Sequence, residues 1–150
     1  MSNPLPYETT LEVRDACLCL HAQRAARALA RRFDEVLRPA GLTNGQFSLL
    51  MALNRPEPPP PGPVAALLAM DRTTLAAALK PLVRRGLAEV RVDAADRRAR
   101  RLALTEAGRN RLAEALPLWR AAHRAIEAET SGLDAEAARA SLRALASIGS

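Results

Sequence analysis

The chain has 150 residues, of which 49% are hydrophobic, 25% charged and 3% aromatic. That length and apolar content suffice for one buried core, which excludes extensive disorder and predicts a single domain, or a compact two-lobed unit, over residues 1–150. No apolar run approaches the roughly 20 residues that cross a bilayer, and residues 1–10 lack the basic and apolar segments of a signal peptide. We therefore expect a soluble protein of the cytoplasm with no membrane partner.

The residue types favour helices over sheets. Ala, Leu and Arg are abundant, and the β-branched residues that prefer strands are few. The two cysteines, Cys17 and Cys19, lie two positions apart without a further cysteine or a paired histidine. This pattern supports neither a disulfide framework nor a zinc site, and side chains two apart on a helix diverge, which disfavours a mutual disulfide. A reducing compartment fits the pattern, and we expect neither a metal nor a cofactor.

The positive charge is concentrated in one part of the chain. Residues 72–111 contain eleven Lys or Arg against four Asp or Glu, a local net charge of +7, while the whole chain carries +6. The remaining residues therefore sum to −1. A basic excess confined to one helix and its following hairpin is the electrostatic footprint of a protein that binds the phosphate backbone of nucleic acids.

The first part of the chain predicts two helices and a connector. Within residues 11–37, apolar side chains recur every three or four positions from Leu18 to Val36, which predicts one long helix that ends near Pro39 and Gly41. Thr43 is expected to cap a second helix. The proline-rich run over residues 57–63 predicts a stiff, extended connector that is not helical inside, with a ligand for a proline-binding module as the less favoured interpretation.

A short helix over residues 64–68 is followed by a capped helix. Asp71 can accept hydrogen bonds from the amides of Thr73 or Thr74, and its charge complements the helix dipole. Pro81 removes a backbone hydrogen bond and predicts a bend or an end nearby. The side chains that this helix should bury are Leu75, Leu79, Leu82 and Val83.

A hairpin follows the capped helix. Residues 87–92 and 101–104 alternate partly with period two, which predicts two short strands. A polar, basic turn over residues 93–100 joins them. A turn with this charge needs an acidic partner to contact.

Two helices are predicted after the hairpin. Thr105 should cap a long helix that reaches about Glu129 and is kinked at Pro117. Asp134 should cap the last helix, whose apolar face is Leu142, Leu145 and Ile148. The terminal helices expose more apolar surface than a small lobe between them could cover. We therefore expect them to pack against a second copy of the chain.

The predicted order of elements is that of a winged helix-turn-helix with helical extensions at both ends. Several motifs point to one family: Gly41-Leu42-Thr43, Asp71-Arg72-Thr73-Thr74-Leu75, Arg85-Gly86-Leu87, and above all Asp93-x-x-Asp96-Arg97-Arg98 followed by Leu104-Thr105-Glu106-Ala107-Gly108. With these motifs the sequence resembles the MarR (multiple antibiotic resistance regulator) family of bacterial transcription factors. The resemblance covers about residues 11–148.

The resemblance implies a mainly α fold with a small β-hairpin wing. Residues 11–38 and 106–148 would form the dimerisation helices, and residues 43–105 the winged-helix DNA-binding lobe. The implied partner is double-stranded DNA with a pseudo-palindromic operator, bound by a symmetric homodimer whose recognition helices enter the major groove and whose wings enter the minor groove. The implied DNA-binding residues are Arg72, Thr73, Thr74, Ala77, Lys80, Arg84, Arg97, Arg98 and Arg100, with Asp96 orienting the wing arginines.

The role of some of these residues stays open at this point. Arg84 and Arg100 are as compatible with a solvated position as with a phosphate contact. Many members of the family are repressors that a small aromatic acid or phenol releases from DNA, bound in a cleft between the dimer helices and the DNA lobe. The residues that could line such a cleft are His21, Arg24, Phe47, Met51, Trp119 and His123, although helical core spacing makes ordinary packing an alternative for Met51 and Trp119.

A thiol switch is the alternative form of regulation. Cys19 falls where the organic-hydroperoxide-sensing branch of the family has a reactive cysteine. Where that branch has tyrosines that hydrogen-bond the cysteine, this chain offers Gln23, Phe33 and Asn44. A lowered thiol pKa needs donors or positive charge nearby, which His21 or Arg24 could supply.

Two other classes of function were compared with a DNA-binding regulator. The chain has no nucleophile-elbow motif, no phosphate-binding glycine loop and only two histidines far apart, so no catalytic residues are expected. A basic helical adaptor without sequence specificity is the second alternative. It would bind acidic partners in a salt-sensitive way that ignores sequence, whereas a repressor would bind a short pseudo-palindrome far more tightly than random duplex.

Overall fold

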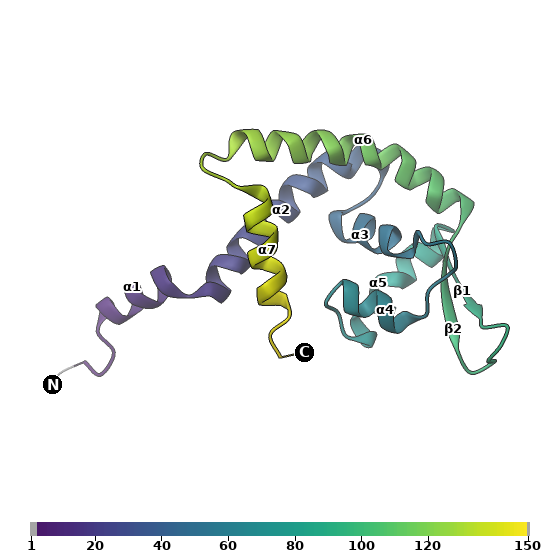
Figure 1. Cartoon of the computed structure of the whole chain (residues 1–150), viewed down its shortest axis with the longest axis horizontal. Helices are drawn as coiled ribbons and strands as arrows, with labels where there is room; N and C mark the ends of the chain where they lie inside the picture. The colour runs from purple at the N-terminus through teal and green to yellow at the C-terminus, as the bar shows by residue number, and fades with distance from the viewer. Residues whose placement is uncertain (1–2, 150) are drawn as a thin grey trace.

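The computed structural model describes residues 3–149 and shows a mainly helical chain with one two-stranded hairpin (Figure 1). The fold class predicted from the sequence is confirmed. Helices α2 and α6 pack against each other, and the hairpin and α1 lie at opposite ends of the molecule. The elements in chain order are α1 (Tyr7–Ala16), α2 (Leu18–Leu37), the 3₁₀-helix η1 (Arg38–Ala40), α3 (Asn44–Leu53), α4 (Pro61–Leu67), α5 (Arg72–Arg84), β1 (Ala88–Val92), β2 (Arg100–Leu104), α6 (Glu106–Glu129) and α7 (Ala135–Ala146).

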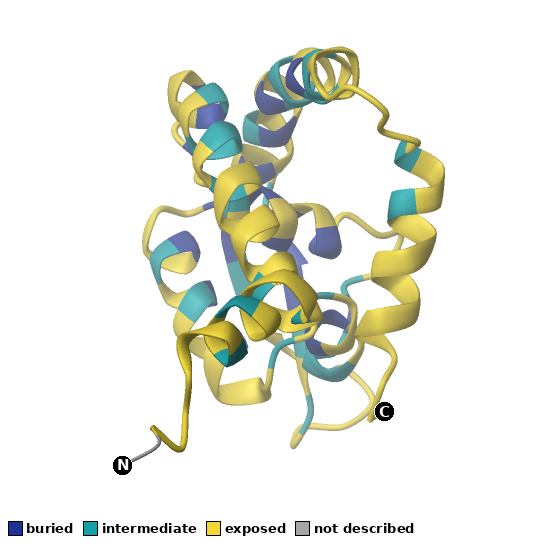
Figure 2. Cartoon of the chain, turned by 90° about the vertical axis from the view of Figure 1, so that its left-hand side faces the viewer, coloured by how far each residue is buried: buried dark blue, intermediate teal, exposed yellow. Residues whose placement is uncertain are grey.

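The buried core lies mainly in a central lobe built by α3, α4, α5, the hairpin and the start of α6. Its side chains Leu50, Val64 and Leu82 have 0% of their surface exposed. Burying one side chain of this kind contributes about 1.5–3 kcal/mol. Figure 2 shows dark buried residues gathered in this part of the fold, while α7 is exposed over most of its length. The central lobe therefore has a core of its own.

Side-chain caps fix the helix starts where the sequence predicts them. Thr43 and Gln46 form a reciprocal capping box, because the Gln46 amide donates to Thr43 Oγ1 (3.2 Å) and the Thr43 amide donates to Gln46 Oε1 (3.1 Å). Asp71, Thr105 and Asp134 each accept a hydrogen bond from the backbone amide three residues later. These four predicted caps are confirmed.

The start of α6 is joined tightly to the base of the hairpin. Thr105 donates its hydroxyl proton to the Gly86 carbonyl (2.7 Å) and its amide proton to the Leu87 carbonyl (3.2 Å). A Cβ placed on Gly108 would collide with the same Leu87 carbonyl, so only glycine allows this approach. The position of the hairpin is therefore fixed relative to α6.

The helix predicted from residue 11 to residue 37 is wrong in one respect, because it is two helices. α1 ends at Ala16, and Cys17 has an extended backbone (φ −72°, ψ 110°) before α2 begins at Leu18. Cys17 Sγ accepts a hydrogen bond from the amide of Leu20 (3.4 Å), as N-cap side chains do. The regular apolar spacing begins only at Leu18, and Arg14 and Asp15 stand where an earlier turn of the same face would need apolar residues. The break therefore coincides with the start of the periodic pattern.

The proline-rich run is only partly an extended connector. Pro61, Gly62 and Pro63 form the first turn of α4, so the prediction that the run is not helical is wrong for these residues. The first amides of a helix have no intrahelical acceptor, and proline is therefore tolerated there. Earlier in the run, the Pro59 carbonyl accepts a hydrogen bond from the amide of Leu102 in β2 (2.8 Å). The connector is thus attached to the hairpin.

Prolines inside helices have different consequences in α5 and α6. Pro81 lies inside α5, which ends three residues later at Arg84, so the predicted end near Pro81 is confirmed. Pro117 lies inside α6, which continues to Glu129, and the kink expected there stays a prediction. Val83 is 38% exposed, so its predicted burial is wrong, whereas the other three predicted core positions of α5 are buried.

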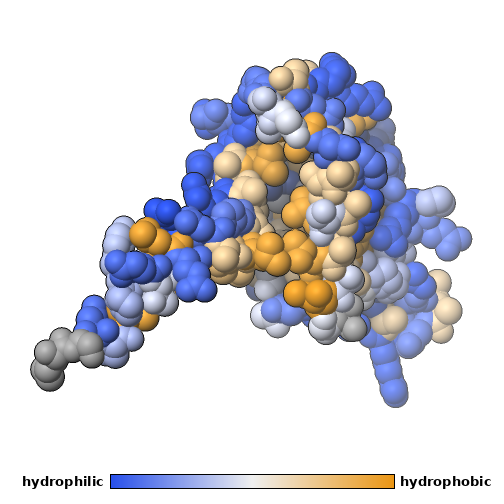
Figure 3. All heavy atoms as spheres, turned by 60° about the vertical axis from the view of Figure 1, so that its left-hand side comes forward, coloured by the Kyte–Doolittle hydropathy of each residue, from blue (hydrophilic) through white to orange (hydrophobic). Residues whose placement is uncertain are grey.

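The terminal helices are poorly covered by their own chain. No residue of α1 or α7 is buried. Apolar side chains near both ends are exposed, among them Tyr7 (68%), Leu142 (53%) and Ile148 (78%). Figure 3 shows apolar side chains gathered on a hollowed face between the arm that leads to the N-terminus and the body of the molecule. The predicted apolar face near the C-terminus is therefore present and exposed, as surfaces that bind partners are.

Candidate nucleic-acid interface

Helix α5 turns one side to the core and the other to solvent. Asp71 Oδ1 accepts a hydrogen bond from the Thr74 amide (2.7 Å), and this bond lowers the pKa of the Asp71 carboxyl below its ordinary value. The six α5 residues predicted to face DNA are all exposed: Arg72, Thr73, Thr74, Ala77, Lys80 and Arg84. Hydroxyls and cations on one rigid face can contact phosphates and base edges.

The tip of the hairpin carries a second group of exposed cations. The strands β1 and β2 pair antiparallel, and the turn between them exposes Arg97 and Arg98. Arg100 is engaged differently, because its guanidinium donates to the carbonyls of Arg97 (3.0 Å) and Ala99 (3.2 Å). Arg100 therefore holds the shape of the tip, and Arg97 and Arg98 carry its unpaired charges.

Asp93 belongs to the wing motif of the sequence, which assigned it no role of its own, and its carboxylate organises the wing. Asp93 Oδ2 accepts a hydrogen bond from Arg101 Nε (2.6 Å), and Asp93 Oδ1 accepts one from the amide of Ala95 (2.8 Å). The bond from Arg101 is the main reason that the pKa of Asp93 is lowered. Asp96, which was expected to orient the wing arginines, accepts a bond from the backbone amide of Arg98 (3.0 Å) and none from a guanidinium within residues 3–149. The place of Asp93 directly after β1, across the hairpin from β2, is the signal that could have revealed it.

Some basic residues of the charged stretch serve the fold instead. Arg85 Nη2 donates to the Gly41 carbonyl (2.8 Å) and Arg111 Nη1 to the Ala40 carbonyl (3.1 Å). These bonds tie the end of α5 and the first turns of α6 to the turn before α3. In contrast, five exposed cations of α5 and the wing tip make no side-chain hydrogen bond or ion pair with any residue that the structure describes: Arg72, Lys80, Arg84, Arg97 and Arg98.

Side chains of α5 and β1 line an apolar hollow of about 440 Å³. Val83 and Val90 line it, together with Lys80 and Arg84. Val83 is exposed because it lies beside this hollow and not in the core. Apolar contacts to deoxyribose and to thymine methyl groups suit such a lining, and the two cations suit phosphates.

The residues predicted to line an effector cleft lie in separate places. Phe47 and Trp119 stack with their ring centroids 6.1 Å apart, and Trp119 and His123 lie 4.9 Å apart. Phe33 of α2 adds a further ring 6.1 Å from His123, so this aromatic cluster joins α2, α3 and α6. Met51 lines a different cavity, of about 270 Å³, against α6.

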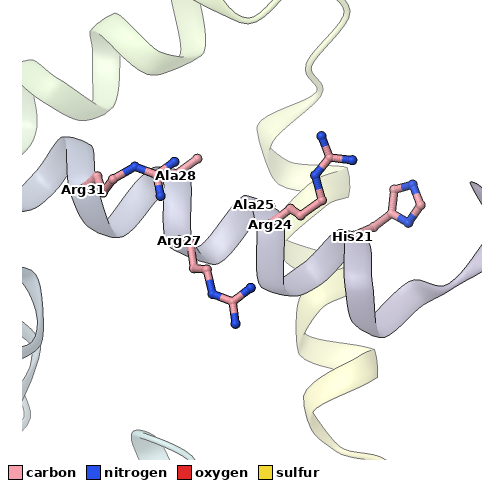
Figure 4. A pocket seen from close by; sticks show the side chains of 6 residues that line it. All are labelled: His21, Arg24, Ala25, Arg27, Ala28 and Arg31. Carbon is pink, nitrogen blue, oxygen red and sulfur yellow. The ribbon is translucent and has the colours of Figure 1, made fainter. Parts of the chain in front are cut away.

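The other two predicted cleft residues belong to the surface of α2. His21 and Arg24 line an open hollow of about 550 Å³ together with Arg27 and Arg31 (Figure 4). His21 Nδ1 donates to the carbonyl of Cys17 (2.7 Å). Figure 4 shows the arginine side chains extending from successive turns of the helix. A single chain therefore does not bring the six predicted cleft residues together.

Cys19 is exposed and accepts one hydrogen bond that the structure records, from Gln23 Nε2 to Sγ (3.4 Å). The other two residues considered as its neighbours are engaged elsewhere. Asn44 donates to Asp34 Oδ1 (2.8 Å), and Phe33 lies in the aromatic cluster. Of the three, only Gln23 therefore contacts the thiol.

Three absences hold for residues 3–149. No helix there is both long and apolar enough to cross a membrane. No three His, Cys, Asp or Glu side chains in that range are placed to hold a metal ion together. No polar or charged residue of the range is buried.

A capped helix with exposed cations, followed by a basic hairpin, defines a winged helix-turn-helix of the DNA-binding class. Comparison with known proteins identifies its family. A family model described as the MarR family matches residues 40–99. The Mycobacterium tuberculosis transcriptional regulator MosR, solved in complex with DNA, is 37% identical with a TM-score of 0.78, over 87% of this chain and 93% of that one.

Two further solved structures are similar to the chain. CouR of Rhodococcus jostii RHA1, a transcriptional repressor bound to a 23-mer DNA duplex, is 30% identical with a TM-score of 0.74, over 89% of this chain and 94% of that one. BpsR of Bordetella bronchiseptica, whose DNA binding is regulated by 6-hydroxynicotinic acid, is 25% identical with a TM-score of 0.71, over 87% and 91%. No curated protein matches the chain.

The chain belongs to the MarR family of transcriptional regulators. The family predicted from the wing and junction motifs is thereby confirmed. The protein is a DNA-binding transcriptional regulator and not an enzyme, as the sequence indicates.

Proposed function

We propose that two copies of the chain bind a pseudo-palindromic operator in the cytoplasm and repress transcription there. The observation that supports this function best is the set of unpaired cations on the exposed face of α5 and at the wing tip. The backbone that carries these cations is already folded, so binding to phosphates needs to order only their side chains. The repressor CouR and the regulator MosR are bound to DNA in their structures, which supports the same assignment.

The two groups of cations divide the work of recognition. We assign Thr73, Thr74 and Lys80 to base edges or phosphates in the major groove, with Ala77 allowing close approach of α5. Arg72 and Arg84 contact phosphates. Arg97 and Arg98 reach the minor groove, whose narrow, negatively charged form attracts arginine, while Arg100 supports the tip.

The homodimer is supported by the exposed apolar side chains of the terminal helices. Half-sites related by two-fold symmetry require two lobes held at a fixed distance. The exposed faces near both chain ends are the surfaces from which such a link can be built. The polar contacts of Thr105 and the close approach of Gly108 would transmit the position of the dimer helices to the wing.

For regulation we favour release by a small aromatic or phenolic acid. The aromatic cluster of Phe33, Phe47, Trp119 and His123 supports this, because it lies where the dimer helices meet the lobe. The regulation of BpsR by 6-hydroxynicotinic acid supports the same class of ligand. A thermal-shift screen of phenolic acids tests this proposal. We expect an acid that stabilises the protein and also releases it from DNA. An acid that binds without lowering the affinity for DNA would contradict the proposal.

A thiol switch at Cys19 is the alternative that one contact favours. The Gln23 amide donates to Cys19 Sγ (3.4 Å), and the thiol is exposed to solvent and so accessible to oxidants. Cys19→Ser should bind DNA normally in reducing buffer. Release of the native protein by peroxide, with no release of this variant, would establish the switch; equal behaviour of both proteins would exclude it.

Selection of duplexes from a random pool tests the operator assignment. A repressor should enrich a pseudo-palindrome that it binds about 10³-fold or more tightly than unrelated duplex at physiological salt. A basic adaptor would enrich no sequence, and its binding would fall with salt to the same extent on every duplex. Failure to enrich any motif with a folded, monodisperse protein would therefore contradict the proposed function.

A further inference from the structure

Helix α1 carries an acidic stripe on an otherwise uncovered surface. Glu8, Glu12 and Asp15 are spaced four and three residues apart, so they lie on one face of the helix. All three are exposed. Asp15 bonds to its neighbour Arg14 (2.7 Å), while Glu8 and Glu12 have no hydrogen-bonding or ionic partner for their carboxylates within residues 3–149. The helix therefore has a net charge of −2, with its carboxylates aligned.

Helix α2 carries a basic stripe of the same length. Arg24, Arg27 and Arg31 are spaced three and four residues apart and line the open hollow on α2 (Figure 4). Their guanidinium groups have no hydrogen bond or ion pair with any described residue. Each stripe spans eight residues, whose seven steps cover about 10 Å along a helix. The two stripes therefore have opposite charges, equal numbers of charged residues and equal lengths.

The two stripes cannot meet within one chain. Only Cys17 separates α1 from α2, and an antiparallel helix pair needs a connection of about two to five residues. Figure 1 shows α1 continuing away from the molecule beyond the start of α2. DNA is also a poor partner for α1, because its carboxylates would repel phosphates. A complementary partner for the acidic stripe is therefore a basic protein surface outside its own chain.

Helix α1 also needs a partner in order to persist. It has ten residues, no buried residue and no side-chain N-cap bond. Isolated helices shorter than about 12–15 residues are marginal in water, and β-branched residues such as Thr9, Thr10 and Val13 lower helix propensity further. Tyr7 and Val13 expose apolar surface beside the acidic stripe, as a docking helix does.

We propose that the acidic stripe of α1 (Glu8, Glu12 and Asp15) docks on the basic stripe of α2 (Arg24, Arg27 and Arg31) of a second copy. The inference rests on the proposed homodimer and names the contact that orients it. Two-fold symmetry turns one complementary pair of stripes into two equal contacts, so three residue pairs give six ion pairs at most in the dimer. Charge pairing of this kind selects the partner and the register of the helices.

Charge reversal tests the contact without DNA. One variant carries Glu8→Arg, Glu12→Arg and Asp15→Arg, and the other carries Arg24→Glu, Arg27→Glu and Arg31→Glu. Sedimentation equilibrium at low salt should show self-association weakened by about tenfold or more in each variant, because like charges then face each other. An equimolar mixture of the two should regain dimers, since both contacts become attractive in the heterodimer. Wild-type dimers should weaken as salt rises, through screening.

A matched control reverses three basic charges elsewhere. Lys80→Glu, Arg97→Glu and Arg98→Glu together should abolish DNA binding and leave self-association unchanged, because these side chains lie on α5 and the wing tip. A chain carrying both stripe reversals should dimerise like the wild type, which guards against a variant that merely fails to fold.

The outcomes separate the contact from the dimer itself. If both reversal variants dimerise as tightly as the wild type, the proposed contact is overturned and the homodimer still stands. Weakening of both variants without recovery in the mixture would also overturn it, because each stripe would then face something else, such as an anionic ligand on α2. A wild-type monomer that binds operator would overturn the homodimer and this contact together.

Discussion

Leu50 in the central lobe has no exposed surface, whereas Leu142 in α7, a residue of the same type, is 53% exposed. The difference extends to whole elements. Helix α3 buries five of its ten residues, and α1, also with ten residues, buries none. The lobe is thus stabilised by contacts within one chain, while the terminal helices carry apolar and charged faces that the chain leaves uncovered. The terminal helices are the proposed interaction surfaces, and the lobe displays the groups that we propose bind DNA.

The largest expected effect is the loss of stability when a leucine is truncated in the lobe, compared with the same truncation in α7. Leu50→Ala should lower the free energy of unfolding by about 2–5 kcal/mol, because it opens a cavity in the core of the lobe. Leu142→Ala should leave lobe unfolding nearly unchanged and weaken self-association instead. Chemical denaturation at two protein concentrations measures both effects. Equal losses from the two substitutions, independent of concentration, would contradict the distinction between the regions.

The junction between the wing and α6 should be the next most sensitive place. Gly108→Ala should cost about 1–3 kcal/mol, because its Cβ collides with the backbone carbonyl of Leu87. Gly45 in α3 has nothing within 4 Å of a built Cβ, so Gly45→Ala should be neutral or slightly stabilising. Thermal unfolding of the two variants makes the comparison. A Gly108→Ala protein as stable as wild type would show that the junction is not close-packed.

At the wing, the distinction lies between unpaired and paired arginines. Arg97→Ala should weaken operator binding by about 1–3 kcal/mol, roughly tenfold to a hundredfold, with unfolding unchanged. Arg91, on the same hairpin, is bonded to Glu89, so Arg91→Ala should change binding much less. Gel-shift titrations at one salt concentration give both affinities. Near-native affinity of the Arg97 variant would refute the wing assignment.

The smallest expected effect is a pH dependence from Asp93. Its pKa is lowered in the folded protein, mainly by the bond from Arg101, so it contributes stability above its ordinary pKa that is lost as the pH falls through its folded pKa. Asp93→Asn should remove part of the decline in thermal stability on acidification. If the Tm of the wild type and the Tm of the variant fall equally from neutral to acidic pH, this contribution is excluded.

Local chemistry explains which parts of the molecule the sequence predicts. The caps at Thr43, Asp71, Thr105 and Asp134 were predictable because a side-chain acceptor at a helix start acts within three residues. The hairpin and its basic tip followed from short-range alternation and charge. The wing and junction motifs of the family were likewise recognisable because their residues are close together in the sequence.

What the sequence missed depends on contacts over longer distances. The break at Cys17 is an exception, because the regular apolar spacing begins at Leu18, directly after it, and Arg14 and Asp15 interrupt the pattern before it. The role of Asp93 arises because the hairpin brings Arg101 beside it, and the exposure of Val83 arises because it lines the open hollow that α5 forms with Val90 of β1. The predicted effector cleft was not assembled in one chain, since its residues were chosen by type and spacing and not by position in space.

The most direct test of the central claim is the stoichiometry of binding to a selected operator and to its isolated half-site. Sedimentation with labelled duplex should give two chains on the full operator, and the half-site should bind at least about a hundredfold more weakly, because a linked second lobe raises the effective concentration at the other half. One chain per operator, with equal affinity for the half-site, would contradict the account of a DNA-binding lobe joined into a dimer by uncovered terminal helices.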